Sequence, residues 1–437
     1  MESAVTSVLN DSSITNFTID MVITNTNDAT YQYTPLSIDK ITIDQNYADN
    51  FADEIFLEFK VSPADYIQLY NNNKGLKVSL RFVYVDPLTL MRVFNPAPIS
   101  RSYKALLMNP VDLLKKYTPG KLMPTDRTQL TEAKVGLQIP VKLWLIEATT
   151  YQLRQQQFNA IISKKTIGDT IRYVANRFQI KQLYLVPPDN QMTWEHLVIP
   201  PAQNFDEIFA YLQYTYGIYM KGIDWYYTNA TLYVYPAYEN NPAINYVANI
   251  YHVDKMSYAG LHSYHSLIAA NLINIVSADE VNTTDISRTT AEENGNSFSF
   301  LRASSVIDNS TTTNAQGTFV NNNNALTVGT KLDRMTTNNA LNPKYTRATN
   351  NIFYENSKLA ELNAVLIECK WSQAVPFQLV PGHNVKYHFD KNGVFTNQQG
   401  ILESATYVFA PVQKLGTGYT YGGVAKLHIR ANSDVSD

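Results

Sequence analysis

The stretch TIGDTIRYVANRFQIKQLYLVPP, residues 166–188, opens the segment around which the rest of the chain is organised. Its first half predicts a helix, because four apolar residues recur about every 3.6 positions and share one face: Ile167, Ile171, Val174 and Phe178. Thr166 and Asp169 stand where a capping box would place them, although Asp replaces the usual Glu or Gln. The run 181–186 predicts a strand, which the following Pro-Pro pair ends because proline has no amide proton to donate.

A second helix is predicted from Asn204, because Glu207 follows three residues later and completes a capping box. Its inner face is expected to hold four residues: Ile208, Tyr211, Leu212 and Thr215. Gly217 lies where a glycine commonly ends a helix, since glycine adopts a positive φ without strain. Two strands are expected to follow, Ile218–Gly222 and Thr231–Tyr235. Together these elements predict a compact α/β module with a core of its own.

Strand-like alternation dominates on both sides of this module. The strands expected before it are Ile14–Thr24, Leu36–Asp44, Glu54–Val61, Leu76–Val85, Arg101–Met108 and Val135–Ala148. Those expected after it are Tyr246–Met256, Ala270–Ser277, Ala364–Trp371, Asn384–Phe389, Ile401–Phe409 and Gly423–Arg430, with a short helix at Ile352–Asn363. Residues 282–351 differ, because they are rich in Asn, Thr and Ser and poor in aliphatic residues. We expect them to form a long insertion that is mobile in the free protein.

These patterns predict an α+β, β-rich fold. Two small β-barrel domains, residues 1–155 and 244–437, are expected to flank a central α/β module, residues 156–243. The insertion at about 282–351 is expected to belong to the second barrel.

The composition narrows the possible functions. The chain has 437 residues, of which 45% are hydrophobic, so a large folded core is expected, and its net charge is −3. That charge gives no support to nucleic-acid binding through bulk positive charge. The single cysteine, Cys369, excludes an internal disulfide framework. The N-terminus does not resemble a signal peptide, and no apolar run approaches the roughly 18 residues of a membrane span, so we expect no membrane anchor.

Three histidines are the only candidates for a metal site. His262 and His265 are three residues apart, and His252 lies nearby, so their imidazoles could share one zinc ion. No carboxylate stands at a recognised spacing from them, which favours ordinary surface histidines. We therefore predict no metal and no cofactor.

The remaining reactive groups also have structural explanations. Cys369 lies in an alternating strand, where a buried thiol is expected, although His383 or His388 could in principle activate it. Asp206 and Glu207 fit the first turn of a helix, where acidic groups face the positive end of the dipole. No nucleotide-binding loop, calcium loop or nucleophile elbow is present. We therefore predict that the protein is not an enzyme.

The central stretch resembles the baseplate or tail hub proteins of contractile-tailed bacteriophages, and is similar to the N-terminal region of type VI secretion spike proteins. The resemblance rests on the helix start TIGDTI at 166–171, the strand end VPP at 186–188, the helix 204–216, the run YGIY at 216–219 and the strand LYVYP at 232–236. The C-terminal stretch from VPGH at 380–383 through 401–411 is similar to the second barrel of such hubs.

This resemblance implies a structural hub without catalysis. In that family three copies form a ring whose six barrels match the six-fold tail tube and join it to the spike below. The implied partners are the chain itself as a homotrimer, the tail tube protein, a separate central spike protein and other baseplate proteins. DNA or the tape-measure protein would pass through the channel without specific binding. The implied location is the virion tail baseplate, assembled in the cytoplasm of the bacterial host.

One turn is a candidate contact with the tail tube: Asp390, Lys391, Asn392 and Gly393. Its Asn-Gly pair tolerates positive φ, which predicts a tight hairpin tip able to project from a barrel.

Two other functions remain open. The chain could be a different tail component, such as a tube terminator or a wedge protein. It could also be a β-scaffold glycan-binding module that uses Trp144, Trp194, Trp225 and Trp371 as sugar platforms, although their positions beside strand residues favour core packing.

Overall fold

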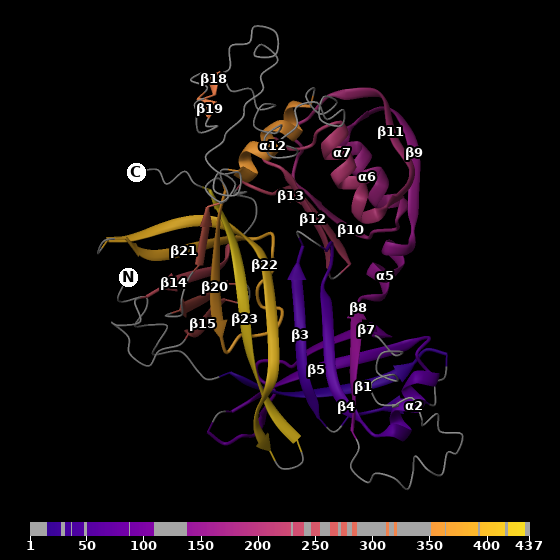
Figure 1. Cartoon of the computed structure of the whole chain (residues 1–437), viewed down its shortest axis with the longest axis vertical. Helices are drawn as coiled ribbons and strands as arrows, with labels where there is room; N and C mark the ends of the chain where they lie inside the picture. The colour runs from indigo at the N-terminus through magenta and orange to yellow at the C-terminus, as the bar shows by residue number, and fades with distance from the viewer. Residues whose placement is uncertain are drawn as a thin grey trace.

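The computed structural model shows a β-rich chain with a few helices (Figure 1). The structure describes residues 15–27, 31–35, 37–47, 50–86, 88–108, 138–228, 230–239, 246–253, 263–269, 272–277, 282–285, 312–313, 319–320, 351–362, 364–391, 394–415 and 418–432. Within these residues, three groups of elements stand out: a closed ring of strands, a second strand set and an α/β module.

The closed ring contains eight antiparallel strands in the cyclic order β22, β3, β4, β8, β7, β5, β1, β23. Their bounds are β1 Asn16–Asn25, β3 Ile38–Asn46, β4 Glu54–Val61, β5 Leu76–Val85, β7 Ile99–Leu107, β8 Ile139–Ile146, β22 Val394–Leu415 and β23 Gly418–Asn432. Six of these strands come from the first third of the chain, and the last two come from its C-terminal end. The ring is therefore completed only when distant parts of the sequence meet.

Side-chain alternation explains why these segments form a barrel. In β5 every second residue from Leu76 to Phe82 is buried while the residues between are exposed, as expected when one face of a strand lines a core. Phe17, Phe82 and Phe409 meet inside the ring, with centroid distances of 5.3–6.1 Å and tilted or edge-to-face geometry. These three rings come from β1, β5 and β22, so aromatic packing joins both ends of the chain.

The second strand set extends from the same hairpin. Its further strands are β14 Tyr246–His252, β15 Ser263–Ala269, β16 Leu272–Ser277, β17 Asn282–Asp285, β20 Ala364–Ser372 and β21 Asn384–Lys391. They follow the order β15-β16-β14-β21-β22 on one side and β23-β20-β17 on the other. β14 runs parallel to both β16 and β21. Ser277 Oγ donates to the Lys370 carbonyl at 3.0 Å, which brings the end of β16 against β20.

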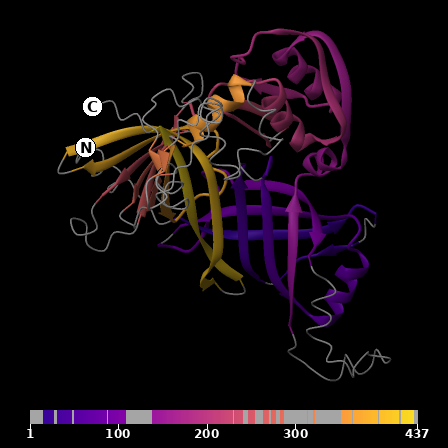
Figure 2. The same cartoon turned by 45° about the horizontal axis from the view of Figure 1, so that its top comes forward.

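The long strands β22 and β23 belong to both bodies. They pair with each other from Gly400↔Ala431 to Leu415↔Gly418. One part of this hairpin pairs with β21 and β20, and the other part pairs with β3 and β1. Figure 2 shows the hairpin running from the second set down alongside the ring. One hydrophobic core therefore continues through both.

The α/β module contains α5 Ala148–Gln155, β9 Gln157–Thr166, α6 Ile167–Arg177, β10 Gln182–Leu185, β11 Thr193–Asn204, α7 Phe205–Thr215, β12 Ile223–Thr228 and β13 Thr231–Pro236. Both expected caps are confirmed: the Thr166 hydroxyl accepts from the Asp169 amide, and Asn204 with Glu207 forms a capping box. The four predicted apolar residues of the first helix are buried. Gly217 has φ +79°, as a helix end requires.

The module differs from the sequence prediction at several points, since α5, β9 and β11 were not expected. Residues 218–222 are not a strand, and the strand lies instead at β12. The reason lies in Gln213 of α7, whose Oε1 accepts from the amides of Ile218 and Tyr219 and so replaces a strand partner. Thr215 is exposed, because the buried face of α7 turns towards Gln213 instead.

The remaining elements are shorter. They are β2 Gln32–Tyr33, α2 Pro63–Asn71, β6 Arg92–Val93, β18 Thr312–Thr313, β19 Phe319–Val320 and α12 Ile352–Leu362. Residues Pro63–Asn71 form the helix α2, which the Ser62 hydroxyl caps by accepting from the Asp65 amide. Most of the insertion 282–351 lies outside the described residues. None of the described helices is both long and apolar enough to cross a bilayer.

The predicted β-rich α+β fold is confirmed, with one closed barrel and further strands. The three domain boundaries stay a prediction. The pairing of β22 and β23 with β3 and β1 shows that residues 394–432 contribute to the ring as well as to the second set.

Candidate assembly surfaces

A buried arginine joins the module to the shared hairpin. Arg430 of β23 is 8% exposed, and its Nη1 donates to Asp224 Oδ2 at 2.7 Å and to the Ala237 carbonyl at 3.0 Å. Its Nη2 donates to Glu403 Oε1 on β22. Burial alone would lower the pKa of Arg430, but the two carboxylates outweigh it and hold that pKa above its usual value. The charged guanidinium therefore fixes β12 of the module against β22 and β23.

A tyrosine cluster lies beside this ion pair. Tyr47 stacks on Tyr226 at 4.2 Å, and Tyr226 stacks on Tyr233 at 4.6 Å, with Tyr235 edge-on at 5.9 Å. Ile401 of β22 packs into the same cluster. Burial raises the pKa of the Tyr47, Tyr226 and Tyr235 hydroxyls well above their ordinary value, so these groups stay neutral. The cluster joins the ring, the module and the second set.

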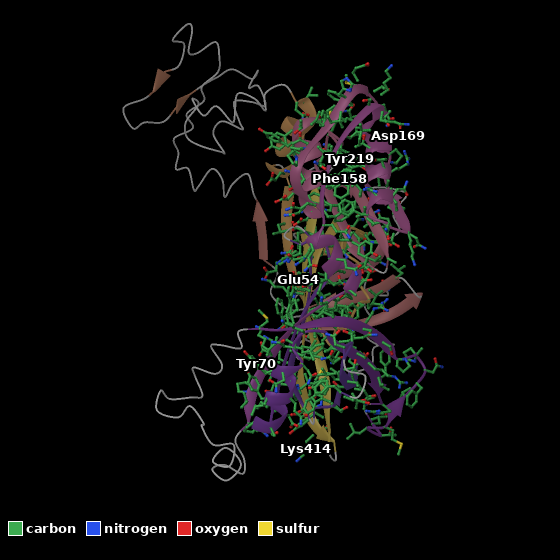
Figure 3. The ribbon with its side chains drawn as sticks, turned by 90° about the vertical axis from the view of Figure 1, so that its right-hand side faces the viewer. Glu54, Tyr70, Phe158, Asp169, Tyr219 and Lys414 are labelled. Carbon is green, nitrogen blue, oxygen red and sulfur yellow. The ribbon has the colours of Figure 1, made fainter. Side chains whose placement is uncertain are left out.

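A small cavity of about 90 Å³ brings two acidic groups together between the ring and the module. Burial raises the pKa of Asp53 and of Glu147 above their usual values. Asp53 Oδ1 already accepts from Gln45 Nε2 at 3.1 Å and from the Tyr47 hydroxyl, so its contacts are those of a structural group. The next residue along the chain, Glu54, forms an ion pair with Arg154 at 2.8 Å, and Figure 3 shows Glu54 between the ring and the module.

The predicted turn at 390–393 lies at the end of the β21–β22 hairpin. The two strands pair as far as Lys391↔Val394, whereas β14 accompanies β21 only to His388. The last pairs of the hairpin therefore extend beyond β14, and Figure 1 shows them reaching away from the ring and the module. Asn392 and Gly393 lie outside the described residues. The assignment of this turn as a tube contact stays a prediction.

An exposed apolar surface at the β5–β6 hairpin was missed from the sequence. Between β5 and β7, three large apolar side chains are exposed: Leu88 by 92%, Met91 by 70% and Phe94 by 59%. Asp86 holds their turn, because its carboxylate accepts from the amides of Leu88 and Thr89 at 2.8 and 3.0 Å. These bonds also lower the pKa of Asp86. A rigid turn that exposes apolar groups is a typical docking element, and the signal was the apolar run after the Asp86-Pro87 turn.

The candidate chemical residues are not brought together in the described part of the chain. His262 lies outside that part, and only the backbone of His265 is described, in β15. No group of three metal-binding side chains occurs among the described residues. Cys369 is buried as expected, which raises the pKa of its thiol to about 12.

The other residues considered as functional candidates, the acidic pair and the tryptophans, have structural roles. Asp206 and Glu207 lie in the first turn of α7, and Glu207 Oε2 accepts from the Asn204 amide at 3.0 Å. Trp371 is fully buried and packs edge-on at 6.4 Å from Tyr407, so its ring is not a sugar platform. Trp194 and Trp225 are partly buried against the module core.

A family model places the chain among known proteins. The model of the bacteriophage PBS1 gene 109 protein matches residues 37–362, about three quarters of the 437 residues. The chain belongs to this family. The matched part runs from the ring strands through the module to α12, and it confirms the expected resemblance to bacteriophage proteins. Among curated proteins, no relative matches the sequence.

Several solved structures align along most of the chain. A tail protein from Neisseria meningitidis MC58 has 10% identity and a TM-score of 0.44, covering 94% of this chain and 96% of that one. The 43 kDa tail protein of prophage MuSo2 from Shewanella oneidensis has 9% identity and a TM-score of 0.38, with coverage of 94% and 96%. The E. coli c3393 protein, a type VI secretion component, has 10% identity and a TM-score of 0.37, with coverage of 89% and 73%. All three scores lie below 0.5, where an alignment does not establish a shared fold.

Proposed function

We propose that this protein is a structural hub of a phage tail baseplate. In this proposal, three copies form a ring that joins the tail tube to a separate central spike and encloses the ejection channel. The observation that carries it is the β22–β23 hairpin, which is continuous through a closed barrel and a second strand set. Membership of a bacteriophage family supports a virion location.

The rigidity of the junction suits this task. A hub transmits force between neighbours, so its two β bodies need a fixed relative position. The buried Arg430 network and the tyrosine cluster supply that fixed geometry. Two β bodies per chain also solve a symmetry mismatch, because three copies then present six bodies to a six-fold tube.

The hub acts through surfaces and performs no chemistry. Its proposed partners are its own copies, the tail tube protein, the spike and other baseplate proteins. DNA or the tape-measure protein passes through the channel without specific binding, since a strongly basic wall would hold the phosphates. The two hairpins, at 390–393 and at 86–94, are the proposed docking elements. Assembly takes place in the cytoplasm of the bacterial host.

Mass photometry of the purified chain tests the ring. We expect a species of three times 49.4 kDa, seen as a ring by negative-stain microscopy. A triple variant, Leu88→Ser with Met91→Ser and Phe94→Ser, removes the apolar hairpin surface while leaving the Asp86 turn. A chain that stays monomeric at micromolar concentration, and forms no ring when tube or spike protein is added, would exclude the hub and favour another tail component.

The tube contact is tested separately. A six-residue Gly-Ser insertion between Asn392 and Gly393 should leave the trimer intact and block pull-down of the tube protein. The same insertion between Asn229 and Ala230, in the β12–β13 turn of the module, is the matched control and should leave tube binding unchanged. If both variants bind the tube equally, the 390–393 turn is not the contact.

A further inference from the structure

A pocket of about 560 Å³ lies between the ring and the module, in the size range of ligand sites, roughly 300–1,000 Å³. The turn between α2 and β5 forms one wall, β7 forms the floor, and α5 forms the other wall. Three lysines line it: Lys74, Lys77 and Lys104. No Asp or Glu is among the described residues that line it.

Two of these lysines stand directly opposite each other. Lys77 of β5 and Lys104 of β7 are cross-strand partners. Like charges in this position destabilise a sheet, whereas opposite charges stabilise it. The neighbouring pair of ring strands shows the usual arrangement, because Glu58 of β4 faces Lys142 of β8 at 3.3 Å. In the described part of the chain no salt bridge includes Lys74, Lys77 or Lys104.

The turn that carries Lys74 is held in place by hydrogen bonds within the chain, and Lys104 has a contact of its own. Asn27 Nδ2 donates to the Lys74 carbonyl at 2.9 Å, and the Thr26 amide donates to the Gly75 carbonyl at 2.8 Å. Gly75 has φ +102°, and a Cβ there would lie 2.7 Å from Thr26 Oγ1, so the turn requires glycine. On the other wall, Lys104 Nζ lies 3.4 Å from the centre of the Tyr151 ring of α5.

We propose that this pocket, defined by Lys74, Lys77 and Lys104, binds an acidic peptide segment of a partner protein. The carboxylates of the segment neutralise the opposed lysines and remove their repulsion. Asn27, Asn73 and Gln152 also line the pocket, and their amides can both donate to and accept from a peptide backbone. A nucleic-acid phosphate offers acceptors only, so the mixed amide lining favours a peptide.

This proposal goes beyond the hub function and does not require it. An acidic segment would bind to a monomer as well as to a ring, so failure of one proposal leaves the other standing. The partner is identified by its negative charge and its peptide backbone alone.

Fluorescence anisotropy with a labelled hexaglutamate peptide tests the pocket. The triple variant Lys74→Gln, Lys77→Gln, Lys104→Gln should bind the peptide about tenfold or more weakly than the wild type, because three surface ion pairs are lost. The control carries the same charge change at three exposed lysines elsewhere: Lys165→Gln, Lys221→Gln, Lys414→Gln. The control should bind as the wild type does. Equal binding by the triple variant and the control would overturn the proposal.

A single variant separates binding from folding. Lys77→Glu converts the Lys–Lys pair into a Glu–Lys pair, so it should raise the melting temperature while it weakens peptide binding. A lower melting temperature would show that Lys77 already has an anionic partner within the chain, which would overturn the premise.

Labelled hexathymidylate serves as the second probe. If it binds to the wild type more tightly than hexaglutamate and loses binding in the same variants, the site is a phosphate site and the peptide proposal is wrong.

Discussion

The closed ring and the second strand set share two strands, yet they are built differently. Every ring strand is antiparallel to both of its neighbours and has a partner on each side. The second set is mixed, because β14 is parallel to β16 and to β21, and its outermost described strands, β15 and β17, each pair on one side only. A closed barrel has no edges, whereas an open edge offers unpaired backbone groups to another chain. Backbone pairing alone closes the ring, whereas in the second set a side-chain contact, from Ser277 Oγ to the Lys370 carbonyl, brings β16 against β20.

The difference between the ring and the second set also indicates which region contributes most to the free energy of unfolding. The ring core includes the packed rings of Phe17, Phe82 and Phe409. The second set is joined to the ring through the shared hairpin, and Arg430 holds the module against that hairpin. Four substitutions can break or sharpen this comparison, and each should be measured by chemical denaturation of the whole chain.

The largest effect is expected in the ring. Phe82→Ala removes a fully buried ring that packs against both Phe17 and Phe409, and it should cost about 4 kcal/mol of unfolding free energy. Ile67→Ala on α2, where the side chain is 45% exposed, is the control and should cost below about 0.5 kcal/mol. A loss below about 1 kcal/mol for Phe82→Ala would show that the ring core is not the main source of stability.

The junction should come next. Arg430→Met leaves Asp224 and Glu403, whose side chains are 19% exposed, without their arginine, so we expect a loss of about 3 kcal/mol. Arg92→Met breaks the exposed pair with Asp20 and should cost less than about 1 kcal/mol. Replacing Asp224 and Glu403 by Asn and Gln in the Arg430→Met chain should recover part of the loss. No recovery would mean that the arginine acts through packing, and not through charge.

A glycine in the shared hairpin gives a smaller effect. A Cβ at Gly423 would lie 2.5 Å from the Ala374 carbonyl oxygen and from the Phe409 ring, so Gly423→Ala should cost about 2 kcal/mol. Gly168→Ala in α6 is the matched control, because the nearest atom there is 3.5 Å away. That substitution should stabilise the protein by about 0.5 kcal/mol through helix propensity. If both glycines tolerate alanine equally, the hairpin has more freedom than its contacts indicate.

The smallest effect concerns pH. Burial raises the pKa of Cys369 in β20 to about 12 from an ordinary value of 9.0, so the native state keeps the proton longer than the unfolded state does. The stability that this thiol contributes is complete below pH 9 and is lost as pH rises towards 12. At pH 10 the wild type should have lost about 1 kcal/mol more than Cys369→Val has. Identical pH profiles would show that the second set opens readily enough to expose the thiol.

The sequence by itself determined the local elements. Thr166 and Asn204 mark helix starts through side-chain groups that act within three residues, so their caps were predictable. The strands Glu54–Val61 and Leu76–Val85 were predicted at their observed bounds, because period-two alternation is a local signal. The resemblance to phage proteins was also predictable from the sequence, and the family match confirms it.

Only the tertiary structure decided how those elements close. The pairing of β1 with β23 joins residues about four hundred positions apart, and nothing in either strand identifies its partner. The local sequence likewise does not identify the partners of Arg430, which are Asp224 and Glu403 from different elements. Nor does it indicate that Lys77 faces Lys104. The alternation of apolar and polar residues predicts which face of a strand is buried. Strand pairing, in contrast, depends on backbone hydrogen bonds that are common to all residues. The barrel, the junction and the lysine pocket therefore appear only when distant strands are placed side by side.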